Sequence, residues 1–92
     1  MKTNIDLPLD ASWSRDELVT VTRLYELVLE ANETGVNREQ LLTTYNKFTR
    51  LIPSRGEQRR LDRQFEKESG VGIYATIKIA QASSRKRIQI DE

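Results

Sequence analysis

The sequence contains neither cysteine nor histidine among its 92 residues. Histidine is the commonest general base, and the two side chains are the usual ligands of protein-bound zinc. Their absence excludes Ser-His catalytic triads, thiolate nucleophiles and a His/Cys zinc site. It also excludes disulfide bonds, which favours the reducing cytoplasm over the setting of small secreted domains.

Long apolar runs are also missing. No stretch approaches the roughly 20 apolar residues that a membrane-spanning helix needs. The N-terminal segment also lacks the apolar run that forms the centre of a signal peptide. We therefore expect a cytoplasmic protein without a membrane partner.

Catalytic motifs are scarce as well. Gly70 and Gly72 precede an expected helix, but without the following Lys-Ser/Thr of a phosphate loop they indicate a tight turn. Glu26, Glu30 and Glu33 share one helical face and could meet a divalent cation, which leaves a carboxylate enzyme as a minor alternative. A solvated charged face explains them more simply. We predict no enzyme activity, no catalytic, cofactor-binding or metal-binding residue, and no cofactor.

What the sequence does contain is typical of a globular protein with a thin core: 37% hydrophobic and 32% charged residues. At this length we expect one domain over residues 1–92. Residues 1–46 carry four basic against eight acidic side chains, a net charge of −4, and residues 47–92 carry eleven against six, a net charge of +5. The basic half could face an acidic partner or the acidic half of the same chain.

Capping signals and apolar spacing predict an all-α fold, a compact four-helix domain with an extended N-terminal arm. The signals are Ser14 with Glu17, Asn37 with Gln40, and Ser54 with Glu57. The predicted segments are an arm at 1–13, helices at about 14–34, 37–52, 54–69 and 73–84, and a polar, frayed tail at 85–92.

Each helix has a predicted inward stripe at helical spacing. The stripe of the 54–69 helix is thin, since only Leu61 and Phe65 point inward, and Arg59 is expected to contact Asp62 on its charged side. The two preceding helices have broad stripes: Leu18, Val21, Leu24, Tyr25, Leu27, Val28, Leu29 and Ala31 in the first, and Leu41, Leu42, Tyr45, Phe48, Leu51 and Ile52 in the second.

The last helix has too little polar surface for one-sided burial. Ile73, Ile77 and Ala80 define one face, while the opposite side is also largely apolar through Ala75, Thr76, Ile79 and Ala82. Such a helix is expected to have a second neighbour, either the arm at 7–13 or another copy of the chain. The leading hypothesis is therefore a non-catalytic interaction or regulatory module that docks a protein partner or self-associates through Ala75, Lys78, Ile79 and Ala82.

The basic residues support an alternative hypothesis, an RNA- or DNA-binding accessory protein that uses the third helix and the tail. Acidic residues interrupt the series, and no segment is a convincing recognition helix. The candidate phosphate contacts are Arg55, Arg59, Arg60, Arg63, Lys67, Arg85, Lys86 and Arg87.

The order and spacing of several short motifs resemble uncharacterised protein family 0223, a family of small bacterial helical proteins. The resemblance covers residues 7–82 and implies a compact four-helix fold without an established activity or catalytic residues. The motifs are Leu7-Pro8-Leu9-Asp10, Trp13-Ser14 with Glu17, Gly35-Val36, Tyr45, Phe48, Ile52-Pro53-Ser54, Glu57, Phe65, Ser69-Gly70 and Tyr74.

Overall fold

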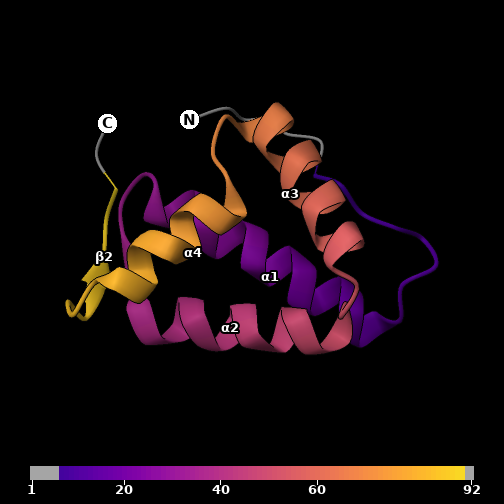
Figure 1. The fold of residues 1–92 in the computed structure, drawn as a ribbon, viewed down its shortest axis with the longest axis horizontal. Coiled ribbons are helices and arrows are strands. Elements are labelled where there is room, and N and C mark those ends of the chain that lie inside the picture. Colours follow the sequence, from indigo (N-terminus) through magenta and orange to yellow (C-terminus); the bar gives the residue numbers. More distant parts are fainter. Residues whose placement is uncertain (1–6, 91–92) are drawn as a thin grey trace.

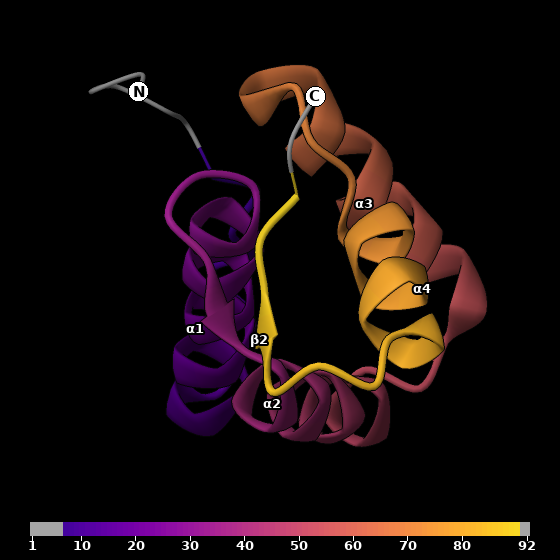
Figure 2. The same ribbon diagram turned by 90° about the vertical axis from the view of Figure 1, so that its left-hand side faces the viewer.

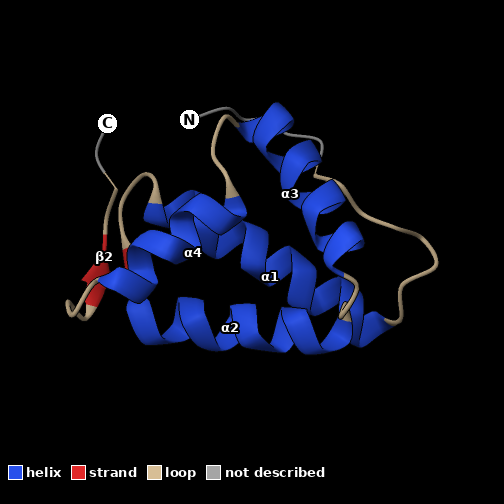
Figure 3. Cartoon of the chain, viewed as in Figure 1, coloured by secondary structure: helices blue, strands red, loops and turns tan. Residues whose placement is uncertain are grey.

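Four helices make up most of the chain in a computed structural model that describes residues 7–90. They are α1 (Arg15–Ala31), α2 (Arg38–Leu51), α3 (Arg55–Ser69) and α4 (Ile73–Ala82), and two short strands, β1 (Val36–Asn37) and β2 (Arg87–Ile88), form an antiparallel pair (Figure 3). Viewed along the long axis, α1, α2 and the α3–α4 pair form three sides of the fold (Figures 1 and 2). The predicted helical class is confirmed.

The helix starts are fixed locally, as the sequence predicts. Ser14 and Glu17 form a reciprocal capping box: the Glu17 amide donates to the Ser14 hydroxyl, and the Glu17 carboxylate accepts from the Ser14 amide. The side chains of Asn37 and Ser54 accept from the amides three residues further on. Each cap satisfies backbone donors that the first turn leaves unpaired.

Two helices end earlier than the apolar pattern suggests. α1 stops at Ala31 instead of 34, because a turn follows in which the Gly35 amide donates to the Glu30 carbonyl at 2.7 Å. Gly35 has φ +100°, and Gly70 ends α3 with φ +84°, so both glycines take the left-handed conformation. α4 stops at Ala82 instead of 84.

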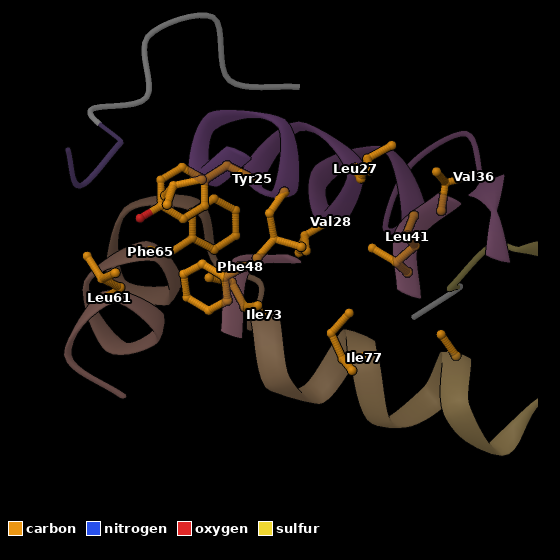
Figure 4. Packing of buried hydrophobic residues seen from close by; sticks show 14 of the residues in the cluster. Tyr25, Leu27, Val28, Val36, Leu41, Phe48, Leu61, Phe65, Ile73 and Ile77 are labelled. Carbon is orange, nitrogen blue, oxygen red and sulfur yellow. The ribbon is translucent and has the colours of Figure 1, made fainter. Parts of the chain in front are cut away.

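The core is built mainly from the inward faces of the helices. Tyr25 of α1 stacks on Phe65 of α3 with 4.7 Å between ring centroids, so Leu61 and Phe65 do hold α3 in place as predicted. Figure 4 shows Tyr25, Phe65 and Phe48 gathered at one end of the core. Leu18 departs from its predicted stripe and is 38% exposed, because the buried face of α1 is centred on Leu24 and Ala31.

The prediction of a frayed tail is wrong for the described part of 85–92. Ile88 pairs with Val36, only 4% of Ile88 is exposed, and the Ile90 amide donates to the Ala31 carbonyl at 2.8 Å. The segment Arg-Ile-Gln-Ile alternates polar and apolar side chains with the period of a strand, which buries one face. Residues 91 and 92 lie outside the described residues.

Two arginines fasten this β pair to the helices. The Arg38 Nε donates to the Ala80 carbonyl at 2.7 Å, which places a positive charge at the C-terminal end of α4, where the helix dipole favours it. The Arg87 guanidinium donates to the Thr34 carbonyl at 2.8 Å. Both bonds join residues that are more than forty positions apart in the sequence.

The described part of the arm, residues 7–13, packs against α1 and the core, so these residues are not the expected second neighbour on the outer side of α4. The Tyr25 hydroxyl donates to the Pro8 carbonyl at 2.8 Å, and Leu7 and Trp13 pack against the core cluster. Burial raises the pKa of Tyr25 far above its ordinary value, which keeps this hydroxyl a donor. Residues 1–6 of the predicted arm lie outside the described residues.

Candidate interaction surface

A cleft of about 560 Å³ opens where α2, α3 and α4 meet. Its lining combines apolar side chains, two tyrosines, two arginines and one carboxylate. The lining residues are Tyr45, Phe48, Thr49, Pro53, Arg55, Gln58, Arg59, Asp62, Ile73 and Tyr74. Since α2 and α3 are joined by the short turn at Pro53, the C-terminal half of one and the first turns of the other meet at this point.

Asp62, the single carboxylate of the lining, is engaged within the protein. Its Oδ1 accepts from the Ile73 amide at 2.7 Å, 11 residues further on. Gly72, the N-cap of α4, has no side chain to make this bond, so Asp62 caps α4 from α3. The predicted contact between Asp62 and Arg59 is therefore wrong, since Asp62 binds the Ile73 amide instead. The ion pair at this spacing on α3 joins Glu57 and Arg60 at 2.7 Å.

Two tyrosines line the cleft, one half-buried and one exposed. Tyr45 is half-buried, and its ring centroid lies 6.1 Å from that of Phe48. Burial, with smaller contributions from Tyr74 and Asp62, raises the pKa of Tyr45 above its ordinary value of 10.0, while Arg55 opposes the shift. Tyr74 is 55% exposed, with the Lys78 Nζ lying 5.6 Å from its ring centroid.

Arg55 and Arg59 lie one turn apart on α3, and both are exposed. Over residues 7–90 the ion pairs join Arg23 to Glu26, Lys47 to Asp16, and Arg60 to Glu57, so neither cleft arginine has a carboxylate partner there. The cleft therefore has an uncompensated positive charge.

The predicted interface residues Ala75, Lys78, Ile79 and Ala82 are all exposed on the outer face of α4. Ile79 is 46% exposed.

Thr76 is predicted to lie on the same apolar side, but it is buried. Its hydroxyl donates to the Gly72 carbonyl at 2.7 Å and accepts from the Asn32 side chain. The cleft and the contribution of Tyr74 to its lining were not predicted from the sequence. The available signal was an aromatic residue directly before Ala75, the first of the predicted interface residues.

The predicted phosphate contacts fall into two groups at opposite ends of α4 (Figure 1). Four of them, Arg55, Arg59, Arg63 and Lys67, form an exposed row with four-residue spacing on α3. Arg60 lies outside that row and is bound to Glu57 and Gln64. Arg85, Lys86 and Arg87 lie in and before β2, where the Arg87 guanidinium is bonded to the turn after α1 and the Lys86 carbonyl accepts from the Arg38 amide.

The three glutamates predicted to share a helical face do not all lie on α1, because Glu33 is in the turn after its last residue. Glu26 is exposed and paired with Arg23 at 3.5 Å, Glu33 is exposed, and Glu30 is half-buried. Within the described part of the chain, no three acidic side chains come together closely enough to hold a metal ion. No helix there combines the length and apolar character needed to cross a membrane.

These features define a mostly helical protein in which four helices and a short antiparallel strand pair surround one core, with a cleft beside α4. A family model described as Uncharacterised protein family (UPF0223) matches residues 4–89, and the chain belongs to this family. This confirms the resemblance noted from the motifs. No function is assigned to the family.

Curated relatives match over nearly their whole length. A UPF0223 protein of Bacillus cytotoxicus is 38% identical over 81 residues, which covers 88% of this chain and 91% of the relative. A UPF0223 protein of Enterococcus faecalis is 38% identical over 85 residues, covering 92% of each chain. The UPF0223 protein YfdD of Lactococcus lactis is 35% identical over 92 residues, covering 100% of this chain and 99% of the relative.

Proposed function

We propose that the protein is a non-catalytic interaction module that docks a partner protein through the outer face of α4 and the adjoining cleft. The observation that carries this proposal is the exposure of Tyr74 and Ile79 on a short helix whose other face is fully buried. Ile79 shares its exposed side of the helix with Ala75 and Ala82. Lys78, whose Nζ lies 5.6 Å from the Tyr74 ring centroid, separates this apolar side from Tyr74. Exposed apolar surface bordered by a charge is typical of a contact site. The cysteine-free sequence fits action in the cytoplasm.

The chemistry of the cleft supports binding over catalysis. The carboxylate of the cleft, Asp62, caps α4 through its Oδ1, and the raised pKa of Tyr45 keeps the proton of that hydroxyl in place, which suits a structural role better than proton transfer. The groups that remain are suited to holding a ligand. They offer hydrogen bonds, positive charge and apolar contact.

Site-specific photo-crosslinking in the producing bacterium tests the proposal. Benzoylphenylalanine replaces Ala82, at the exposed end of the α4 face, and the adducts are compared between the parent protein, Ile79→Glu and Thr43→Glu. We expect one predominant adduct that is lost in Ile79→Glu and retained in Thr43→Glu, because Thr43 is exposed on α2, away from the buried stripe. Since Ile79 is half-exposed, its substitution should change the free energy of unfolding by no more than about 0.5 kcal/mol.

Three outcomes would contradict the proposal. A sharp loss of stability in Ile79→Glu would make that residue part of the core. The absence of any adduct would remove α4 as a docking face. An adduct with twice the mass of the protein would show that the face binds a second copy instead of a different protein.

A further inference from the structure

Several polar side chains of the cleft already have their hydrogen bonds. The Thr49 hydroxyl donates to the Asn46 carbonyl at 2.9 Å, and the Gln58 Nε2 donates to the Ile52 carbonyl at 2.7 Å. Asp62 accepts from the first amide of α4. These groups maintain the walls of the cleft and contribute little new binding capacity.

The polar side chains of the cleft that make no hydrogen bond within residues 7–90 all carry donors, although the tyrosine hydroxyls and the second carboxylate oxygen of Asp62 can also accept. These donors are the guanidinium groups of Arg55 and Arg59, with five N–H groups each, and the hydroxyls of Tyr45 and Tyr74. A ligand that satisfies them must supply acceptors, and the positive charge favours an anionic acceptor. A carboxylate can bind a guanidinium through two parallel hydrogen bonds, so it suits this pair of arginines.

The same cleft also offers apolar surface. Phe48 and Ile73 contribute to its lining from the core, and Pro53 and the two tyrosine rings complete it. An apolar or aromatic side chain placed there would cover surface that is now open to water. The combination suits a ligand in which an anionic group and an apolar group stand a few ångströms apart.

We propose that the cleft binds an acidic segment of the partner protein, with aspartate or glutamate carboxylates at Arg55 and Arg59 and an aromatic side chain between Tyr45 and Tyr74. This inference rests on the proposed function and specifies the chemistry of the partner. An acidic protein segment fits better than a nucleic acid, because the cleft adjoins the apolar side of α4 and the second basic group, at 85–87, lies beyond the far end of that helix.

A peptide titration followed by ¹⁵N–¹H NMR tests the inference on the full chain. The probe is the acetylated and amidated pentapeptide Glu-Glu-Phe-Glu-Glu, compared with Gln-Gln-Phe-Gln-Gln and Glu-Glu-Ala-Glu-Glu. We expect a dissociation constant of about 0.1–1 mM for the first peptide and at least about tenfold weaker binding for either control. The largest shifts should fall on the amides of Thr49, Arg59 and Tyr74.

Paired charge reversals on α3 locate the binding groups. Arg55→Glu with Arg59→Glu should weaken binding of the first peptide by at least about tenfold. Arg63→Glu with Lys67→Glu is the matched control, because both residues are exposed on the same helix at the same spacing but lie outside the cleft lining. This control changes the net charge equally and should keep the dissociation constant within about twofold.

Equal losses in the two double variants would overturn the inference, since they would indicate attraction by overall charge. Tighter binding of a short oligothymidylate at the same amides would assign the cleft to nucleic acid. If peptide binding is absent while the crosslinked adduct still depends on Ile79, the acidic-segment inference fails and the proposed function stands. If the adduct is absent as well, both fail.

Discussion

At the scale of single residues, the structure depends on a few positions where backbone geometry leaves little choice. Gly35 is one of them. It combines a left-handed backbone with a close approach by the Arg87 side chain, and a Cβ built on Gly35 would lie 2.8 Å from the Arg87 Nε. The glycine therefore permits both the turn after α1 and the contact that holds β2 against it.

Gly35→Ala should lower the free energy of unfolding by about 1–3 kcal/mol, because alanine is strained at this φ and its Cβ displaces Arg87 from the Thr34 carbonyl. Chemical denaturation of the purified variant measures the loss. Gly56→Ala is the control: Gly56 lies in the first turn of α3 with only the Ser54 Oγ nearby, at 3.8 Å, so the change should be neutral or stabilising by about 0.5 kcal/mol. Equal effects at the two glycines would contradict this account.

At the scale of elements, β2 is held by burial of one side chain as well as by its pairing with β1. Ile88 belongs to the core cluster together with Val36 and Ala31. A two-residue strand has too few backbone hydrogen bonds to persist alone. Its apolar anchor therefore decides whether the segment after α4 is ordered.

Ile88→Ala should destabilise the protein by about 2–4 kcal/mol through lost apolar burial and the cavity left behind. Urea denaturation gives the total, and amide hydrogen exchange at Ile90 reports whether the bond to the Ala31 carbonyl opens first. Gln89→Ala removes an exposed side chain from the same segment, and with it only the solvent-exposed hydrogen bond from its Nε2 to the Glu33 carbonyl at 3.1 Å, so it should cost no more than about 1 kcal/mol. A small effect of Ile88→Ala would show that the strand pair holds without its anchor.

The elements also show what could be predicted from the sequence. Helix starts were predictable because the Ser14, Asn37 and Ser54 caps act across three residues, within reach of a sequence pattern. The cap of Ile73 by Asp62 and the pairing of Val36 with Ile88 were not, because they join positions 11 and 52 residues apart. The cleft depends on the first of these contacts, so it could not be predicted, although Arg55 and Arg59 of its lining were among the candidate phosphate contacts.

At the scale of the whole molecule, the free energy of unfolding depends on pH, because exposed hydrogen bonds stabilise the ionised form of two carboxyl groups in the folded state. Hydrogen bonds from the Ser12 side chain and amide lower the pKa of Asp10 from its ordinary 3.8, and the Arg60 side chain lowers that of Glu57 from 4.5. The folded state thus holds these protons less tightly than the unfolded state. Their contribution is present above these ordinary values and is lost as the pH falls through the lower folded pKa values.

The urea midpoint should therefore decrease between pH 5 and pH 2, and the decrease should be smaller in Glu57→Gln, which removes one of the two groups. Glu39→Gln, at an exposed position on α2, serves as the control for loss of a carboxylate. Because the hydrogen bonds of both carboxylates are exposed and screened by solvent, the difference should shrink at high salt. An acid profile that is identical in Glu57→Gln and the parent would contradict the assignment.

The strand pair also constrains the order in which a newly made chain can complete its fold. α1 and α2 are adjacent in the sequence and can pack as soon as both have left the ribosome. The partner of Val36, by contrast, is synthesised 52 residues later. Every nascent chain therefore passes through an interval in which one flank of its core, at Ala31 and Val36, is still exposed to the chaperones and proteases of the cell.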